Sequence, residues 1–201
     1  MTPAAAATDR ERRAQAQRER ILAAAKQCFI EHGFHAASMA GIAETAGMSP
    51  GLMYRYFENK SAIVLAIVGE QLEKVRADIT SLGADSRLAD RMLARVEHWR
   101  RGSPEIMSPA LLLEMSAEAP RDPVVAEAIG RSDRQARGDL AAWLSRPIPE
   151  GGLGLGPDAA ASRALLVQCF AEGLAVRAVR EPDLPRPELE RAVQLFYAAL
   201  F

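Results

Sequence analysis

Cysteine, histidine and aromatic residues are scarce in this 201-residue chain. It holds two cysteines, three histidines and only 5% aromatic residues. Cys28 and Cys169 lie far apart in the sequence, so neither a disulfide framework nor a cysteine metal cluster is suggested. The histidines are too scattered to predict a metal site. We therefore expect two reduced core cysteines, no metal and no cofactor.

The sequence also lacks long apolar runs and the alternation of apolar and polar residues that is typical of strands. No stretch of about 18 residues reads as a membrane-spanning helix. The alanine-rich start of the chain lacks the apolar segment of a signal peptide. We expect an all-α, cytoplasmic protein of about nine helices, with no membrane partner.

The net charge is small, at −1, but it is unevenly distributed. Residues 1–60 carry eight Lys or Arg against six Asp or Glu, a local excess of two positive charges. The remaining residues carry a local excess of three negative charges. A locally positive N-terminal part suits an encounter with the phosphates of DNA.

The stretch from Ser38 to Lys60 predicts two short helices joined by a tight turn. Ser38 is a candidate N-cap, and Gly47 can take the left-handed backbone at which helices often end. Ser49 and Pro50 then restart a helix as its N-cap and first residue. This pattern is typical of a helix-turn-helix, whose second helix lies in the major groove of DNA. The alternative is an ordinary αα-hairpin.

The start of the second helix offers outward backbone amides, hydroxyls and tyrosines for contacts with DNA. Leu52 and Phe57 are the expected inward residues. Basic residues of the preceding helix either reach the DNA backbone or form ordinary i, i+4 pairs on a solvated surface. The candidate DNA-binding residues are Ser38, Met39, Ser49, Pro50, Gly51, Tyr54, Tyr56 and Lys60, with Arg10 and Arg13 upstream.

Several of these positions together carry a family resemblance. Gly33-Phe34, Ser38, Ile42-Ala43, Ala46 to Ser49, Gly51, Tyr54, Phe57 and Lys60 resemble the N-terminal domain of the TetR family of repressors. The resemblance covers the first third of the chain. Ser38 stands where the family usually has threonine, and Met53 where it often has leucine or isoleucine. The resemblance implies a homodimer on a palindromic operator, controlled by a ligand in the C-terminal body.

The pattern of helix starts and breakers predicts three regions. We expect a disordered tail over residues 1–8, a three-helix DNA-binding domain over 9–60, and a helical ligand-sensing and dimerisation domain over 61–201. The expected helices of the last region span 61–82, 87–101, 108–119, 122–145, 158–181 and 188–201. The glycine-rich segment 146–157 predicts a flexible loop. No strand precedes it, so a nucleotide-binding motif is not indicated there.

Methionines and tryptophans in the central helices predict either an apolar cavity or a packed core. The candidate pocket residues are Met92, Trp99, Met107, Leu111, Met115 and Trp143, with Glu114 as a polar group.

The last two helices carry apolar stripes that we expect at a dimer interface, unless both stripes are buried within one subunit. The candidate interface residues are Leu165, Cys169, Leu189, Val193, Phe196, Tyr197 and Leu200.

These patterns together favour a sequence-specific transcriptional regulator. The resemblance to the TetR family implies a repressor that an apolar or amphipathic small molecule releases from double-stranded DNA. A ligand-independent, architectural DNA-binding protein is the main alternative. A helical enzyme is less favoured, because Glu114 and Glu118 are the nearest approach to a catalytic carboxylate pair.

Overall fold

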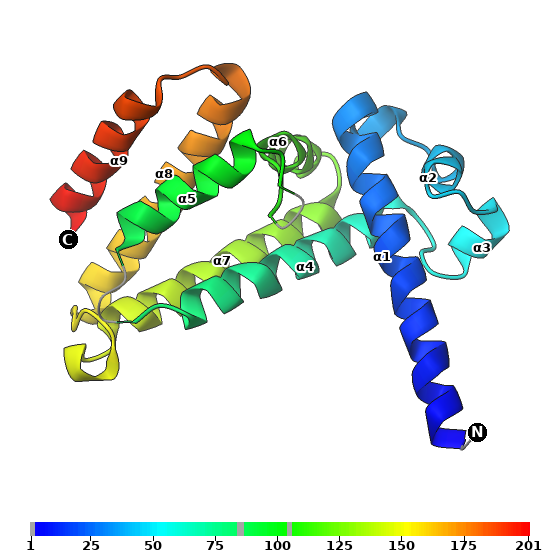
Figure 1. Ribbon diagram of the computed structural model, residues 1–201, viewed down its shortest axis with the longest axis horizontal. Coiled ribbons are helices and arrows are strands. Elements are labelled where there is room, and N and C mark those ends of the chain that lie inside the picture. The colour runs from blue at the N-terminus through cyan, green and yellow to red at the C-terminus, as the bar shows by residue number, and fades with distance from the viewer. Residues whose placement is uncertain (1–2, 84–86, 104–105) are drawn as a thin grey trace. The chain divides into compact units, whose positions relative to one another are not determined.

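The computed structural model describes residues 3–83, 87–103 and 106–201, and within these ranges it contains helices and no strand. The all-α prediction is therefore confirmed. Figure 1 shows the elements in chain order, which are α1 (Pro3–Ala36), α2 (Met39–Thr45), α3 (Pro50–Tyr54), α4 (Lys60–Thr80), α5 (Leu88–Arg100), α6 (Pro109–Glu118), α7 (Pro123–Ser145), the 3-10 turn η1 (Ile148–Glu150), α8 (Pro157–Arg180) and α9 (Arg186–Leu200).

The chain forms two compact units. The first runs from the N-terminus to Val68 and also includes Glu114–Glu127, and the second comprises Gly69–Leu113 and Ala128–Phe201. This division differs from the boundary that we expected after residue 60. Helices α4, α6 and α7 each contribute residues to both units, because the boundaries fall within these helices.

Polar contacts explain why the end of α6 belongs to the first unit. The backbone N–H of Phe34 donates to Oε2 of Glu114 at 3.2 Å. Oε2 of Glu118 lies 3.3 Å from Nε2 of His35. Glu118 is 5% exposed. Both carboxylates thus belong to the packing of the first unit.

Helix α1 is longer than expected at its start. Residues 3–8 belong to α1 instead of a disordered tail, and residues 1 and 2 lie outside the described ranges. Four consecutive alanines at 4–7 have the highest helix propensity and favour this extension. At the other end, Gly33 has φ +76° and interrupts the regular helix where we expected it to end. Ile21, Ala25 and Phe29 form its buried stripe.

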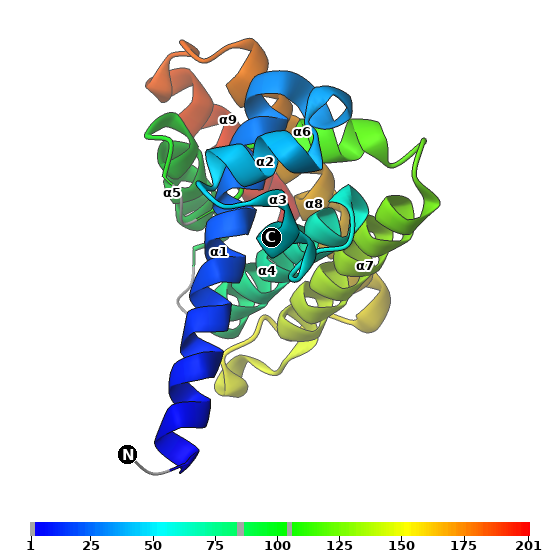
Figure 2. The same ribbon diagram turned by 90° about the vertical axis from the view of Figure 1, so that its right-hand side faces the viewer.

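The second unit has a core to which α5, α7, α8 and α9 all contribute. Figure 1 shows α5, α8 and α9 alongside one another. Figure 2 shows α4 next to α7, where Nε of Arg76 donates to Oδ2 of Asp139 at 3.0 Å. The buried core comprises Leu82, Ala89, Met92, Val96, Leu140, Trp143, Leu144, Ala160, Ala164, Val167, Leu174, Leu189, Val193, Tyr197 and Leu200.

The glycine-rich segment 146–157 is more ordered than the flexible loop that we expected. Backbone N–H groups of Gly154 and Leu155 donate to the carbonyls of Arg146 (2.8 Å) and Leu144 (3.0 Å). A Cβ atom on Gly152 would lie 2.1 Å from the carbonyl oxygen of Arg146. Glycine is needed there because the two backbone segments touch.

Helix α8 is long and apolar enough to cross a membrane by length and composition alone, although we expected no such helix. This property is weak support for a membrane span, because core helices share it. In the structure, Ala160, Ala164, Val167, Leu174 and Ala175 of α8 are buried. Burial of this face accounts for part of the apolar character of α8.

Candidate functional site

Two serine caps define the helix pair at α2 and α3. Oγ of Ser38 accepts a hydrogen bond from the N–H of Gly41 at 3.0 Å, and Oγ of Ser49 accepts one from Leu52 at 3.3 Å. Gly47, in the turn between the helices, has φ +60°. The predicted caps and the left-handed glycine are therefore confirmed. Each serine satisfies a backbone donor that a helix start leaves without an intrahelical partner.

Two arginines of α1 hold this helix pair in place. Nη2 of Arg20 donates to the carbonyl of Gly47 at 2.9 Å. Nη1 of Arg18 donates to the carbonyl of Tyr56 at 3.2 Å, and its guanidinium lies 4.5 Å from the centre of the Phe57 ring. Both side chains fix the turn and the end of α3. This structural role was not among the two that we considered from sequence, a contact with the DNA backbone and a solvated helix surface.

The exposed side of α3 offers a compact set of groups. Tyr54 is 55% exposed, and Ser49, Pro50 and Gly51 are also exposed. Met53 is fully buried and Phe57 is nearly so, whereas Leu52 is half-buried. Met53 therefore joins Phe57 as the main anchor, in place of Leu52. The i, i+4 spacing of Met53 and Phe57 is the sequence signal that could have identified this pair.

Other candidate DNA-binding residues are placed differently from our expectation. Tyr56 follows α3 instead of lying near its start, and both Tyr56 and Met39 are half-buried. Nζ of Lys60 donates to the carbonyl oxygens of Phe34 (2.7 Å) and His35 (3.3 Å). This ammonium group also lies 4.6 Å from the centre of the Phe34 ring, so it packs against the C-terminal end of α1.

Arg10 and Arg13 are exposed on α1. They are thus placed on the surface of the first unit, as a contact with a phosphate backbone would require.

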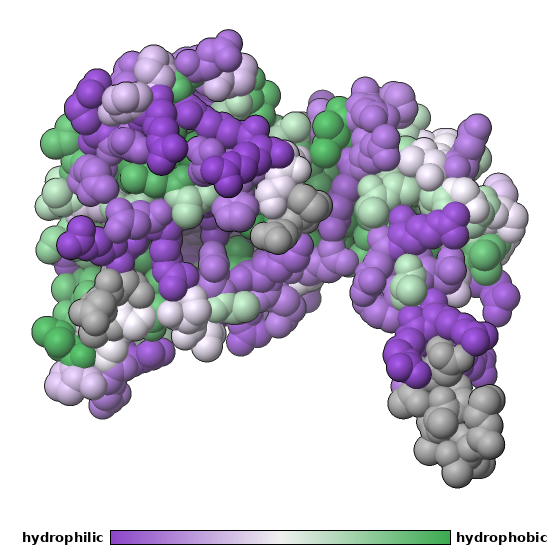
Figure 3. All heavy atoms as spheres, viewed as in Figure 1, coloured by the Kyte–Doolittle hydropathy of each residue, from purple (hydrophilic) through white to green (hydrophobic). Residues whose placement is uncertain are grey.

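A cavity of about 260 Å³ lies within the second unit. Met92, Trp99 and Met107 line it, as expected from sequence. Figure 3 shows a hollow in the surface of this unit that is rimmed by hydrophilic residues. Its other apolar lining residues are Val75, Ile79, Leu82, Leu88, Ile106, Leu112, Ala136, Leu140, Ala164, Val167 and Ala171.

Four expected pocket residues do not line this cavity. Leu111, Met115 and Trp143 are buried, and the indole N–H of Trp143 donates to the carbonyl of Gly151 at 3.0 Å. Glu114 accepts the Phe34 N–H within the first unit. Leu111, Met115 and Trp143 therefore belong to the packed core, the alternative that we considered for them. The sequence could not decide between the two roles, because apolar helical positions look the same whether they fill a core or line a cavity.

Sequence reasoning missed the charged lining of the cavity. Asp78 of α4 pairs with Nη1 of Arg91 at 3.7 Å and with Nη2 of Arg95 at 3.2 Å. Nη1 of Arg137 donates to Oε1 of Gln168 at 3.0 Å. These groups come from separate helices, so no single spacing in the sequence could have revealed the set.

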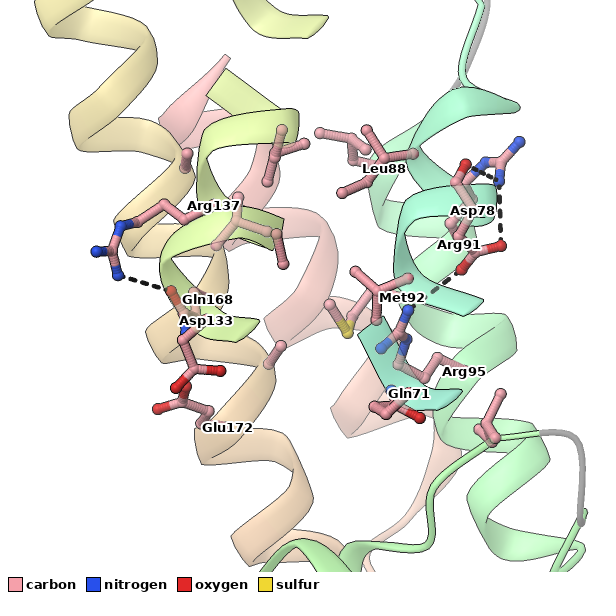
Figure 4. Close-up of a pocket in the computed structure, with 18 of the residues that line it drawn as sticks. Gln71, Asp78, Leu88, Arg91, Met92, Arg95, Asp133, Arg137, Gln168 and Glu172 are labelled. Atoms are coloured by element: carbon pink, nitrogen blue, oxygen red, sulfur yellow. Dashed lines mark hydrogen bonds and ion pairs between the residues drawn. The ribbon is translucent and has the colours of Figure 1, made fainter. Parts of the chain in front are cut away.

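Two further carboxylates, Asp133 of α7 and Glu172 of α8, face each other at one wall of the cavity (Figure 4). Burial raises the pKa of Asp133 above its ordinary value of 3.8, and the charge of Glu172 raises it further. The opposing effects of Arg137 and Arg134 are smaller than this combined shift. Burial also raises the pKa of Tyr197, another lining residue, to about 12, so its hydroxyl stays protonated at neutral pH.

The expected dimer residues divide into buried and exposed groups. Leu189, Val193, Tyr197 and Leu200 are buried within the subunit, and the Phe196 ring stacks on Phe170 with 3.9 Å between centres. The stripe of α9 therefore packs in the core of its own subunit, which agrees with the alternative that both stripes are buried within one subunit. The exposed apolar residues of the two helices include Leu165, Leu166, Cys169, Val179 and Leu195, of which Leu195 is 72% exposed.

Comparison with known families gives two matches along the chain. Residues 21–67 match the model of the bacterial regulatory proteins of the tetR family. Residues 104–201 match the model of the C-terminal part of BetI-type transcriptional repressors. The first match contains the helix-turn-helix, and the second contains α6 to α9.

Individual relatives and solved structures agree with these matches. The chain is 34% identical to the HTH-type transcriptional regulator UidR of Escherichia coli strain K12 over 113 residues, which are 56% of this chain and 57% of UidR. It therefore spans little more than half the length of this relative. The HTH-type transcriptional repressor AcnR of Corynebacterium diphtheriae is 32% identical over 81 residues, covering 40% of this chain and 42% of AcnR.

Similarity to a solved structure extends over most of the chain. The structure of Salmonella enterica GusR superimposes with a TM-score of 0.70 and 27% identity, covering 90% of this chain and 95% of GusR. The helix-turn-helix geometry, the two family matches and this superposition lead to one conclusion. The chain belongs to the TetR family of bacterial transcriptional regulators.

Proposed function

We propose that the protein binds a palindromic DNA operator as a homodimer and represses transcription until a small molecule enters the cavity of the second unit. The observation that carries the DNA-binding part is the exposed face of α3. Ser49, Pro50, Gly51 and Tyr54 are exposed there, at the start of a capped helix. The N-terminal residues of such a helix contact base edges and phosphates in helix-turn-helix proteins.

The buried side of the same element supports this assignment. Met53 and Phe57 anchor α3, and Arg18 and Arg20 hold it to α1. A reading helix must be rigid, because base contacts require side chains at fixed positions. We assign Ser38 to the cap of α2, next to the DNA backbone, and Arg10 and Arg13 to phosphate contacts. We assign Lys60 to the packing of α1 instead of to a DNA contact, since its ammonium group binds carbonyl oxygens at the end of α1.

The cavity supports control by a ligand. An architectural DNA-binding protein needs no internal cavity, whereas this second unit has one of about 260 Å³ with a mixed apolar and charged lining. Helices α4, α6 and α7 have residues in both units, so continuous backbone connects the cavity-bearing unit to the DNA-binding unit. A ligand with sufficient preference for the released conformation would shift the population, and a change from 1:99 to 99:1 requires about 5.5 kcal/mol.

The exposed apolar face of α8 and α9 supports the homodimer. Leu165, Leu166, Cys169 and Leu195 are exposed within one subunit, although Leu, Ile and Cys side chains are usually buried. A twofold contact through this face would bury them in a helical interface. A dimer would also place two copies of α3 on successive half-sites, about 34 Å apart. We place the protein in the cytoplasm, where it meets its operator.

Selection from a pool of random duplex DNA tests this proposal without knowledge of the regulated gene. We expect enrichment of an inverted repeat with half-sites about one helical turn apart, because each subunit reads one half-site. The control is the Ser49→Ala, Tyr54→Ala double variant, carried through the same rounds. Failure of the native protein to enrich any sequence would contradict the proposal, and enrichment of a single unrepeated site would contradict the twofold arrangement.

A further inference from the structure

We propose that the cavity of the second unit binds a small amphipathic organic cation, an amine or quaternary ammonium compound, whose charged group lies at Asp133 and Glu172. The apolar part of the ligand would lie against the wall that contains Met92, Trp99 and Leu140. The inference rests on the proposed function only where it identifies this ligand as the effector. Binding of the cation itself is a property of the cavity.

Two negative groups lie at one wall of the cavity. Asp133 and Glu172 come from α7 and α8, and their carboxylates face each other beside the cavity (Figure 4). Repulsion between the two carboxylates and the partial burial of Asp133 both disfavour the charged form. The raised pKa of Asp133 is consistent with this arrangement. A ligand cation between the carboxylates would relieve the repulsion and replace lost hydration.

Three arginines of the cavity lining already have polar partners. Arg91 and Arg95 both pair with Asp78, at 3.7 Å and 3.2 Å. Arg137 donates to Gln168 instead of to Asp133. An anionic ligand would have to compete with Asp78 for Arg91 and Arg95, and near Arg137 it would also meet the Asp133 and Glu172 charges. A cation requires no such exchange at Asp133 and Glu172, where the effect of Arg137 on Asp133 is smaller than that of Glu172, so this wall of the cavity favours a positive group.

The size of the cavity and its apolar wall limit the size and shape of the ligand. The volume of about 260 Å³ lies just below the range of roughly 300–1,000 Å³ that is usual for small-molecule sites. The indole N–H of Trp99 donates to the carbonyl of Met107 at 3.1 Å, which satisfies the polar edge of this ring. The remaining lining is largely aliphatic. A ligand with one ring or a short alkyl chain beside its cationic group matches these dimensions.

A matched set of probes tests the charge preference. Phenylbutylamine, phenylbutanol and phenylbutyrate share one apolar skeleton and differ in charge. Their binding can be measured by calorimetry and by the change in tryptophan fluorescence, to which Trp99 in the cavity lining and Trp143 both contribute. We expect the amine to bind at least about tenfold more tightly than the alcohol, since a hydrogen bond to a charged group contributes about this factor. We expect phenylbutyrate to bind most weakly. Equal affinity for amine and alcohol, or no binding of the amine, would overturn the proposal.

Substitutions test whether Asp133 and Glu172 bind the cationic group. Asp133→Asn with Glu172→Gln should abolish the tenfold preference while leaving the alcohol affinity within about twofold, because volume is conserved and only charge is removed. Glu150→Gln, an exposed acidic residue of η1 outside the cavity lining, is the matched control and should retain the preference. Circular dichroism confirms that each variant is folded. A double variant that is folded and still prefers the amine would overturn the assignment of the site.

The same samples separate this inference from the proposed function. Binding to a selected operator is measured first without any probe and then with saturating phenylbutylamine. Amine binding by a protein that fails to bind DNA would leave the cation site standing and remove the proposed function. Specific DNA binding without a preference for the amine would support the DNA-binding part of the proposed function and overturn the cation site.

Discussion

Nζ of Lys60 lies 2.7 Å from the carbonyl oxygen of Phe34 and 4.6 Å from the centre of the Phe34 ring. The ammonium group thereby joins the first residue of α4 to the end of α1, next to the left-handed Gly33. A hydrogen bond from a cation to a helix-terminal carbonyl is favourable because the helix dipole is negative there. Lys60 is therefore a structural residue of the DNA-binding unit.

We predict that Lys60→Met lowers the free energy of unfolding by about 2 kcal/mol. The variant loses a charge-assisted hydrogen bond and a cation–π contact but keeps the aliphatic stem. In a chain of this size, that loss lowers the melting temperature by roughly 4–8 °C. Thermal unfolding followed by circular dichroism measures the change. The exposed Lys74→Met on α4 is the control, and an equal effect of both substitutions would refute the role of Lys60.

The close backbone contact at Gly152 gives a second prediction. Gly152→Ala should destabilise the second unit by about 2 kcal/mol or more, because the new Cβ would lie 2.1 Å from the carbonyl of Arg146 and 2.6 Å from that of Trp143. Gly138→Ala, inside α7 with nothing within 4 Å of the added Cβ, should instead stabilise by up to about 1 kcal/mol. Urea unfolding compares the two. A neutral Gly152→Ala would show that this loop is not packed as described.

Gly33 and Gly152 show which features of the fold could be predicted from the sequence and which could not. The caps at Ser38 and Ser49 and the break in α1 at Gly33 were predictable because each depends on neighbouring residues. The close contact at Gly152 was not, since glycine-rich segments read as flexible when their tertiary contacts are unknown. Asp133 and Glu172 were missed for a related reason, as they meet only through the packing of α7 against α8.

The apolar stripe of α9 illustrates a different limit. Helical periodicity correctly predicted a face with Leu189, Val193 and Tyr197 that avoids water. Periodicity does not identify the partner of that face, and here the partner is the core of the same subunit. Exposure in the structure, at Leu166 and Leu195, was needed to select another face for the interface.

The proposed interface predicts a change in oligomeric state. Leu166→Glu combined with Leu195→Glu should convert a dimer into a folded monomer. A twofold contact through this face would bury the new glutamates of both subunits without positive partners, which is strongly unfavourable. Sedimentation equilibrium measures the mass. Val124→Glu on α7 replaces another exposed apolar residue, which belongs to the first unit, and should remain dimeric. A dimer that persists in the double variant would place the interface elsewhere.

The pKa of Asp133 predicts how stability depends on pH. Because folding raises this pKa above 3.8, the folded state holds the proton more tightly than the unfolded chain does. Its favourable contribution is complete below pH 3.8 and is lost as the pH rises through the folded pKa. Asp133→Asn should therefore raise the free energy of unfolding at neutral pH and remove this part of the pH dependence.

Urea unfolding at a series of pH values measures the effect of Asp133→Asn, with Glu150→Gln as the exposed control. An unchanged stability profile in Asp133→Asn would mean that the carboxylate is solvated in the folded protein. That result would also weaken the electrostatic argument for a cation at this wall of the cavity.

The central claim is that the exposed face of α3 reads DNA, and the affinity of Tyr54→Ala tests it most directly. The measurement compares native protein, Tyr54→Ala and Lys74→Ala on the DNA upstream of the protein's own coding region or on a selected operator, at fixed salt and with nonspecific competitor. We predict an affinity loss of roughly tenfold for Tyr54→Ala, with unchanged melting temperature, and no loss for Lys74→Ala. Equal affinities for all three proteins, or no competitor-resistant complex with the native protein on either DNA, would contradict the account.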